Sequence, residues 1–179
     1  DADDGNDGRE LWAHDTSNHS TWQVADIRSG GGHSLPGIDL QILVDDTIYF
    51  SAADIYDGRE LWAHDTSNHS TWQVADIRSG SYGSGLGDYM GILVGDTIYF
   101  DASDGLDGIE LWAHNTLNHS TWQIADIRSG HANSHPGYQM AILVGDTLYF
   151  DANSGVNGAH AFQDNELWAM RIDHSITYN

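Results

Sequence analysis

The stretch Asp7–Gly30, DGRELWAHDTSNHSTWQVADIRSG, returns unchanged fifty residues later at Asp57–Gly80. A third copy at Asp107–Gly130 differs at four positions, and Glu166–Ala169 opens a fourth copy with the same Glu-Leu-Trp-Ala. A repeat of this length is typical of solenoids, propellers and arrays, in which each unit buries its apolar face against its neighbour. We therefore expect one repeat domain, residues 1–179, with units at about 1–50, 51–100 and 101–150 and a partial unit at 151–179. Repetition of every motif favours multivalent binding over a single catalytic centre.

The composition of the chain limits its partners. The 179 residues are 40% apolar, which is enough for a packed core, and they carry a formal charge of -21. Such a surface repels nucleic acid and anionic membranes, and no apolar run is long enough for membrane insertion. The absence of cysteine excludes disulfides and thiolate metal sites, whereas the clustered carboxylates favour a bound divalent cation. Because the chain begins at Asp1 rather than Met, we interpret it as a processed or excised segment.

Each unit reads as short β-strands separated by turns. Two runs rich in β-branched and aromatic residues are joined by Gly95-Asp96, which predicts a hairpin with a primed turn. No segment shows the period of a helix, so the expected fold class is all-β, with about four strands per unit. In the second unit the expected strands are Leu61–His64, Thr71–Ile77, Ile92–Val94 and Thr97–Phe100.

The apolar pattern of these strands indicates sheets that are buried on both faces. Both parities are apolar in Ile92–Val94 and in Ile98–Phe100, as in propeller blades that stack face to face. In a sandwich whose sheets have one solvent-exposed face, apolar and polar residues would alternate more regularly along each strand. We expect a β-propeller-like repeat of about 3.5 blades and roughly fourteen strands. Three closures stay open: a small ring with an incomplete last blade, a homodimer that closes a seven-bladed ring, or a slice of a longer array.

The order of motifs in the unit resembles the bacterial ELWxxDGT repeat family. The Glu-Leu-Trp triplet stands at Glu10–Trp12, Glu60–Trp62, Glu110–Trp112 and Glu166–Trp168, and a later Asp-Ile pair follows in each of the first three units. The Asp-Gly-Thr of the family is shortened here to Asp15-Thr16 and its copies, without the glycine. The resemblance covers essentially the whole chain. It implies a propeller-like fold and an extracellular or cell-surface location, and it implies no common activity.

The acidic loop before each Glu-Leu-Trp is the strongest candidate for a metal site. Carboxylates at loop positions 1, 4, 7 and 10, with glycines that permit tight curvature, are suited to surround Ca²⁺ with oxygen ligands. The spacing differs from that of an EF-hand, and Asp and Gly are also ordinary turn residues, so turn chemistry alone is the alternative. The candidate ligands are Asp1, Asp4, Asp7, Glu10, Asp54, Asp57, Glu60, Asp101, Asp104, Asp107 and Glu110.

Histidine and tryptophan recur at fixed places in the unit. The histidines of the first strand, such as His64, and of the next turn, such as His69, are expected to be exposed, because a zinc site would need three or four converging ligands. Tryptophans flanked by polar residues suit a sugar-binding groove between blades, although packing of one blade on the next is the competing interpretation. The candidate ligand-binding residues are Trp12, Trp22, Trp62, Trp72, Trp112 and Trp122.

Two functions follow from these patterns. The first is a non-catalytic, secreted or surface module that is stabilised by calcium and binds carbohydrate or surface glycans at several sites, as a lectin does. The alternative is a structural, self-assembling surface-layer, fibre or matrix unit whose repeats are bridged by calcium. No nucleophile stands in an elbow motif, and every candidate residue is repeated, so we expect no enzyme.

Overall fold

A computed structural model of the chain describes residues 1–155 and 165–172. The described residues form strands and turns without any helix, so the prediction of an all-β chain is confirmed for them, and they contain no helix that could span a membrane. The rest of the partial fourth unit, 156–164 and 173–179, lies outside the described residues. The strands are β1 (Ala2–Asp3), β2 (Arg9–Asp15), β3 (Ser20–Ala25), β4 (Gln41–Val44), β5 (Thr47–Ala53), β6 (Arg59–Asp65), β7 (Thr71–Ala75), β8 (Gly91–Val94), β9 (Thr97–Ala102), β10 (Glu110–Asn115), β11 (Thr121–Ala125), β12 (Ala141–Val144), β13 (Thr147–Asn153) and β14 (Asn165–Arg171).

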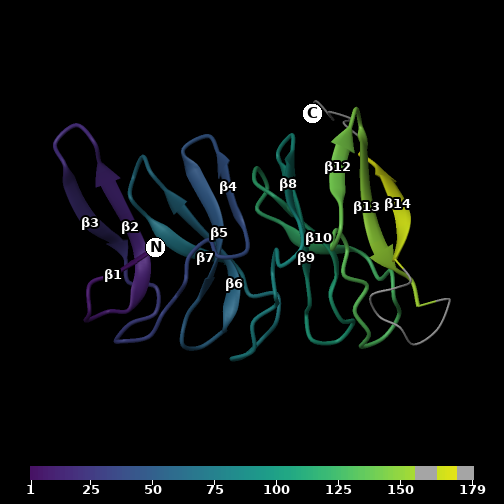
Figure 1. The fold of residues 1–179 in the computed structure, drawn as a ribbon, viewed down its shortest axis with the longest axis horizontal. Coiled ribbons are helices and arrows are strands. Elements are labelled where there is room, and N and C mark those ends of the chain that lie inside the picture. The colour runs from purple at the N-terminus through teal and green to yellow at the C-terminus, as the bar shows by residue number, and fades with distance from the viewer. Residues whose placement is uncertain (156–164, 173–179) are drawn as a thin grey trace.

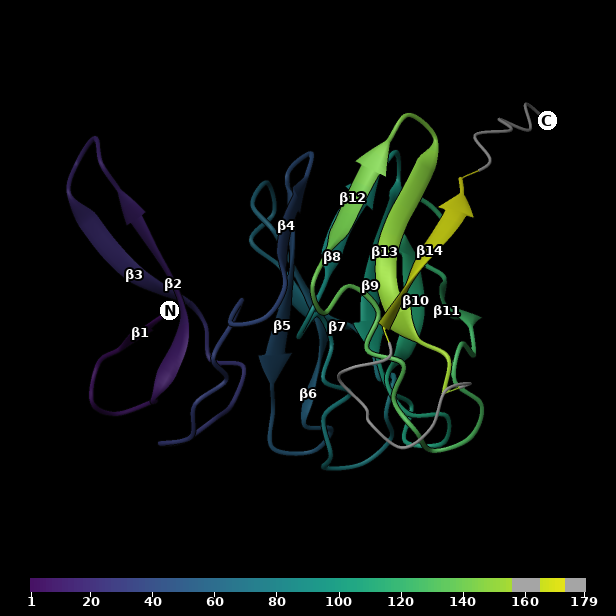
Figure 2. The ribbon, with the colours of Figure 1, turned by 45° about the vertical axis from the view of Figure 1, so that its right-hand side comes forward.

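The strands form four separate antiparallel sheets that follow one another along the chain. The first sheet has the order β1-β2-β3, the second β4-β5-β6-β7, the third β8-β9-β10-β11 and the fourth β12-β13-β14. Figure 1 shows them side by side in chain order, with the first and fourth sheets at opposite ends of the row. In the turned view of Figure 2 the first sheet stands apart from the other three. Each sheet is open, and the row as a whole is open too.

The local predictions for the second unit are confirmed. The expected strands overlap β6, β7, β8 and β9, although β7 ends at Ala75, two residues before the expected end at Ile77. The hairpin β8–β9 pairs Leu93 with Ile98 and Val94 with Thr97. The turn between them has Gly95 at φ 56°, the positive angle that a primed turn needs at its first central residue.

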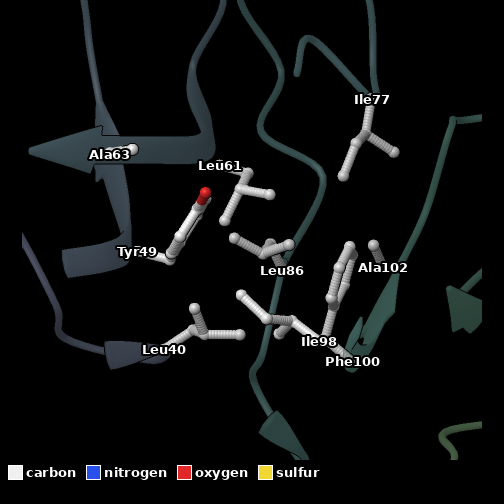
Figure 3. Close-up of a cluster of buried hydrophobic side chains, with 9 residues drawn as sticks. All are labelled: Leu40, Tyr49, Leu61, Ala63, Ile77, Leu86, Ile98, Phe100 and Ala102. Carbon is white, nitrogen blue, oxygen red and sulfur yellow. The ribbon is translucent and has the colours of Figure 1, made fainter. Parts of the chain in front are cut away.

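An apolar cluster fills the space between the second and third sheets. Tyr49 and Leu61 enter it from the second sheet, and Ile98 and Phe100 enter it from the third (Figure 3). Each buried side chain of this size contributes roughly 1.5–3 kcal/mol by leaving water. The buried members are Leu40, Tyr49, Leu61, Ala63, Ile77, Leu86, Ile98, Phe100 and Ala102.

A second cluster joins the third sheet to the fourth. Tyr99, on the opposite face of β9 from Phe100, packs here with Leu111 of β10 and with Leu148 and Phe150 of β13. The third sheet is therefore covered on both faces, which is what the apolar residues of both parities in Ile98–Phe100 predict.

A buried glutamate ties each of the first three units to the sheet that follows. Glu10 is completely buried; its carboxylate accepts hydrogen bonds from Ile27 N at 2.9 Å and from Ser34 Oγ at 2.6 Å. The carbonyl of Ser34 accepts a bond from Ala53 N at the end of β5, in the second sheet. The same pairs of residues recur, and we call each a Glu–Ser staple: Glu10 with Ser34, Glu60 with Ser84, and Glu110 with Ser134. In the second unit Ser84 is close enough to lower the pKa of Glu60, while its hydroxyl donates to Arg59 O at 3.2 Å.

Candidate functional site

The glutamates at loop position 10 are the same residues that form the Glu–Ser staples. Glu60 and Glu110 are fully buried, and each accepts a hydrogen bond from the amide of an isoleucine, Ile77 at 2.9 Å and Ile127 at 2.8 Å. Burial raises the pKa of each carboxyl to about 7, against the lowering effect of these hydrogen bonds. The sequence pattern predicts calcium ligands here, whereas in the structure Glu110 accepts hydrogen bonds from backbone amides and the hydroxyl of Ser134, and Glu60 accepts one from the amide of Ile77.

The aspartate at loop position 1 also bonds to the backbone. Asp101 is completely buried, and its Oδ1 accepts hydrogen bonds from Tyr89 N at 3.0 Å and Met90 N at 2.8 Å. Burial raises the pKa of this carboxyl to about 7. Ser51 Oγ takes the same role in the second unit, where it accepts bonds from the amides of Asp39 and Leu40. Asp1, at the equivalent place in the first unit, is exposed.

The aspartates at loop position 4 close tight turns. The Oδ1 atom of Asp4 accepts hydrogen bonds from the amides two and three residues later, and Asp54 and Asp104 repeat this pattern. The third-residue donors are the amides of Asp7, Asp57 and Asp107, at loop position 7. This is ordinary turn chemistry, the alternative to a calcium site.

Over residues 1–155 and 165–172, no three His, Asp or Glu side chains are grouped so that they could hold a metal ion. The predicted ligands are instead spread over three environments: the buried staples, the buried loop caps and the exposed turns. Calcium binding at the acidic loops stays a prediction of the sequence, without a ligand set in the described residues.

The two classes of tryptophan occupy different environments. Trp12, Trp62 and Trp112 are half-buried, and Trp112 packs against the cluster between the second and third sheets. The other class projects into solvent: the exposed fractions of Trp22, Trp72 and Trp122 are 45%, 37% and 41%. The packing interpretation therefore fits Trp112, and the second class offers an accessible aromatic surface.

A cavity of about 410 Å³ lies beside Trp22, between the first sheet and the second. This volume is within the range of small-molecule sites. Strands β2 and β3 supply its apolar wall, while β6 and the following turn bring imidazole and hydroxyl groups from the other side. We call it the Trp22 groove, and its lining residues are Ala13, Trp22, Gln23, Val24, His64, Thr66 and His69.

The polar groups of this groove are arranged by the sheets themselves. His64 is buried, and its Nδ1 lies 2.8 Å from Thr71 Oγ1, which fixes the orientation of the ring. Burial, together with the nearby imidazole of His69, lowers the pKa of His64, so the ring is neutral at neutral pH. A neutral imidazole offers one donor and one acceptor, which suits hydroxyl groups.

The second and third sheets carry the same types of residue at equivalent positions. Trp72 corresponds to Trp22, and His114, Thr116 and His119 correspond to the three polar residues on the far wall. At the next junction the position of His114 is taken by Met170. The complete set of residue types therefore occurs twice, and the exposed tryptophan occurs three times.

Two histidines in the first strand of the repeat unit are buried, although the sequence predicts that they are exposed. His64 and His114 were expected to be exposed, but their exposed fractions are 5% and 0%, because the preceding sheet covers them. The expectation is met for His19, His69 and His119 in the turns. The ring of His114 is tilted by 46° against that of Tyr49, with ring centroids 5.4 Å apart, and burial lowers the pKa of His114 to about 4.

The buried His114 predicts a specific loss of stability in acid. Its folded-state pKa lies below the unfolded value of 6.5, so its contribution is present above pH 6.5 and is lost as the pH falls toward 4. Between pH 7 and pH 5 the free energy of unfolding of the wild type should fall by about 1–2 kcal/mol more than that of His114→Gln. Urea titrations at both pH values measure this difference. His131→Gln, on an exposed loop, should lose as much stability between the two pH values as the wild type does. Equal losses for all three proteins would show that His114 is not the source of the acid sensitivity.

Comparison with known proteins does not assign the chain to a family. No protein-family model matches the chain, and no curated protein matches it. The resemblance to ELWxxDGT repeats therefore stays a prediction, and the evidence that bears on function is the geometry of the Trp22 groove.

The serines of the staples were missed by sequence reasoning. Ser34, Ser84 and Ser134 are buried and connect the glutamates to the next sheet. A signal was present, because the loops after Gly30, Gly80 and Gly130 vary in sequence while this serine keeps its place, 24 residues after each glutamate.

Proposed function

We propose that the protein is a non-catalytic, multivalent module that binds carbohydrate in the grooves between consecutive sheets. The observation that carries the proposal is the Trp22 groove, in which an exposed tryptophan lies with His64, Thr66 and His69. Trp72 and Trp122 are exposed in the same way, and we infer equivalent sites beside them from the repeat. An indole face packs against the apolar face of a sugar ring, while neutral imidazole, amide and hydroxyl groups bond to its hydroxyls.

The repetition supports a polyvalent ligand. One shallow site with a single aromatic platform binds a sugar weakly, but linked sites that engage one glycan chain raise the overall affinity by orders of magnitude. A glycan with repeated units is the ligand that benefits from nearly identical sites at regular spacing. Such ligands coat cell surfaces and matrices, which agrees with the proposed extracellular or cell-surface location.

In this proposal the sheets are blades of a propeller-like array. What supports it is the antiparallel order of four strands in the second and third sheets and the face-to-face packing of successive sheets through apolar clusters. The array acts as a spacer that keeps the tryptophans apart at fixed intervals. Calcium binding at the acidic loops is a further hypothesis of this proposal, and the same binding experiment tests it.

A glycan-array screen with millimolar Ca²⁺ and with EDTA tests the proposal directly. We expect binding to a defined class of sugars, and replacement of Trp72 by alanine should weaken it by at least roughly tenfold, as expected for an aromatic hot spot. The triple variant Trp22→Ala, Trp72→Ala, Trp122→Ala should abolish it, because no linked site remains. Loss of binding in EDTA would show that sugar binding requires calcium, and unchanged binding would show that it does not.

Tyr56→Ala is the matched control, since this aromatic side chain is 72% exposed and lies on an acidic loop outside the Trp22 groove. It should bind as the wild type does. A silent array in both conditions, or equal binding by the triple variant, would refute carbohydrate binding at the grooves.

A further inference from the structure

Three asparagines of the chain stand two residues before a serine, and all three occupy the same turn of the repeat. The sequence Asn-His-Ser occurs at Asn18–Ser20, Asn68–Ser70 and Asn118–Ser120. In residues 1–177 no other asparagine has serine or threonine two positions later. Asparagine in the pattern Asn-X-Ser/Thr, where X is not proline, is the acceptor of asparagine-linked glycans on secreted proteins. Each of the first three units therefore carries one such acceptor pattern.

The pattern is kept in the third unit, where the rest of the turn changes. The third copy of the repeat differs from the first two at four positions, and two of these lie in this turn: Asn115 replaces Asp65, and Leu117 replaces Ser67. Both changes precede the pattern directly, yet residues 118–120 are the same as in the other copies. The Asn-His-Ser residues are thus retained while their neighbours vary.

The acceptor side chains are exposed at the tips of the turns. Asn18, Asn68 and Asn118 are exposed, and so are the serines that follow them. The three turns join β2 to β3, β6 to β7 and β10 to β11, the last two strands of each sheet. Figure 1 shows the turn between β2 and β3 projecting from the end of the first sheet. An enzyme can therefore approach the amide group from solvent.

The backbone of each turn folds the serine back onto the asparagine. The middle histidine has a positive φ, 62° at His69, with 60° and 58° at its two equivalents. The amide of Ser70 then donates a hydrogen bond to Asn68 Oδ1 at 2.9 Å, and the other two turns repeat this bond at 2.8 and 3.0 Å. In the third unit the hydroxyl of Ser120 also donates to Asn118 Oδ1, at 2.6 Å. The serine thus holds the amide oxygen, and the nitrogen Nδ2 is the atom left for reaction.

The start of the turn is fixed to the neighbouring hairpin. Thr66 donates hydrogen bonds from its amide and from its hydroxyl to Asp46 O, at 2.8 and 2.9 Å. Thr116 makes the same two bonds to Asp96 O, at 2.8 and 3.0 Å. The exposed asparagine follows two residues later. The acceptor therefore lies on a turn with a fixed base and an accessible tip.

We propose that Asn18, Asn68 and Asn118 are sites of asparagine-linked glycosylation, with a lipid-diphosphate-linked oligosaccharide as donor and an oligosaccharyltransferase as enzyme. In this step Nδ2 of the asparagine attacks C1 of the first sugar, the N–C1 bond forms, and the bond from C1 to the diphosphate oxygen breaks. The lipid diphosphate leaves with the electron pair of that bond, and Nδ2 gives up one proton. The step therefore needs no oxidant or reductant. It agrees with the extracellular or cell-surface location proposed above.

A glycan on Asn68 should stand at the rim of the Trp22 groove. His69, the middle residue of this acceptor pattern, lines the groove together with Trp22. The attached sugar chain should therefore compete with an external sugar for the same indole face. This consequence rests on the proposed function, whereas the modification itself does not.

Enzymatic transfer to the folded chain tests the proposal. The full chain, produced in cells that do not glycosylate asparagine, is incubated with a purified oligosaccharyltransferase and lipid-diphosphate-linked chitobiose. We expect the intact mass to rise by one, two and finally three glycan units. A glycosidase that cleaves the bond to asparagine should then leave aspartate at positions 18, 68 and 118 in a peptide map.

Matched variants separate the acceptor nitrogen from the turn. Asn68→Asp keeps the Oδ1 acceptor for Ser70 N and removes Nδ2, so it should fold as the wild type does and carry one glycan fewer. Ser70→Ala removes the hydroxyl that the pattern requires, keeps the backbone bond, and should lose the same glycan. Asn6→Asp changes an exposed asparagine outside the pattern and should leave all three glycans in place. Far-UV circular dichroism shows whether each variant is folded.

Two results would overturn the proposal. One is a folded chain that stays unmodified under conditions that fully glycosylate a short Asn-His-Ser peptide. The other is a glycan that appears only on peptides released by proteolysis, because the folded turns would then not be acceptors. A turn that stays unmodified while the other two react would remove that asparagine from the proposal. Glycan-array binding by the unmodified chain is independent of these results, so the two proposals fail separately.

Discussion

Replacing Glu110 by alanine should lower the free energy of unfolding by about 3 kcal/mol at pH 5.5. The carboxyl group is completely buried and accepts hydrogen bonds from Ile127 N at 2.8 Å, Ser134 N at 3.2 Å and Ser134 Oγ at 2.7 Å. Its removal leaves the buried amide of Ile127 without its acceptor, at a cost of roughly 1–3 kcal/mol, and leaves the amide and the hydroxyl of Ser134 with only the carbonyl of Ile109 as acceptor. It also weakens the attachment of the loop that carries Ser134, which then depends on the bonds from Ser134 to Ile109 O. Urea unfolding followed by tryptophan fluorescence measures the loss.

Two variants separate the staple from a general effect of charge. Glu110→Gln keeps one acceptor oxygen in the same place and should lose less than half as much as alanine. Asp96→Ala removes a carboxylate from an exposed hairpin turn and should change stability by no more than about 0.5 kcal/mol. Similar losses for Glu110→Ala and Asp96→Ala would show that the staple does not stabilise the fold.

The same side chain predicts a dependence on pH with a defined sign. Burial raises the pKa of Glu110 to about 7 from 4.5, so the folded state binds the proton more tightly than the unfolded state. The stability that this proton provides is present below pH 4.5 and is lost as the pH rises through 7. From pH 5 to pH 8 the wild type should therefore lose on the order of 2–3 kcal/mol relative to Glu110→Gln, whose amide does not titrate.

The sequence predicts the strands because their signals are local. The hairpin at Gly95-Asp96 needs only β-rich runs on both sides and a residue that tolerates a positive φ, and all three are visible in the letters. The alternation that buries both faces of β9 is equally local, so the apolar clusters on each side of the third sheet could be expected.

The candidate site could be predicted only in part, because burial depends on the place of a unit in the row. Residues 7–30 and 57–80 have identical sequences, yet His14 is exposed and His64 is 5% exposed, since only the second has a sheet in front of it. No reading of one repeat could separate them. The acidic loops show the same limit: a carboxylate that caps amides from a loop 24 residues away looks in sequence like a carboxylate that binds a cation.

The staples and the grooves depend on each other through this long-range contact. The loop that carries each staple serine leads from the last strand of one sheet to the first strand of the next, and Ser34 bonds to both sheets. We therefore expect the staple at Glu10 to help hold Trp22 in place against the wall with His64 and His69. Loss of Glu10 should disturb sugar binding at the Trp22 groove without altering any residue that lines it.

Gly108→Ala should destabilise the protein by about 2–4 kcal/mol, although it adds a single methyl group. Gly108 has φ +81°, and a Cβ there would lie 2.5 Å from the carbonyl oxygen of Ala132 and 2.7 Å from its carbon. Gly130 is the matched control, because its φ is +82° and nothing lies within 4 Å of the added carbon. Gly130→Ala should cost about 1 kcal/mol, the penalty of the left-handed conformation alone. Chemical denaturation of both variants gives the difference, and equal losses would contradict the close approach.

The close approach at Gly108 is what allows the loop to reach the staple. Ala132 lies two residues before Ser134, whose amide lies 2.9 Å from Ile109 O and 3.2 Å from Glu110 Oε1. A methyl group at Gly108 pushes this loop outward and weakens the bonds that Glu110→Ala removes. The double variant Gly108→Ala, Glu110→Ala should therefore lose less stability than the sum of the two single variants, as expected for residues that act on one contact. Additive losses would mean that the glycine and the glutamate stabilise the loop independently.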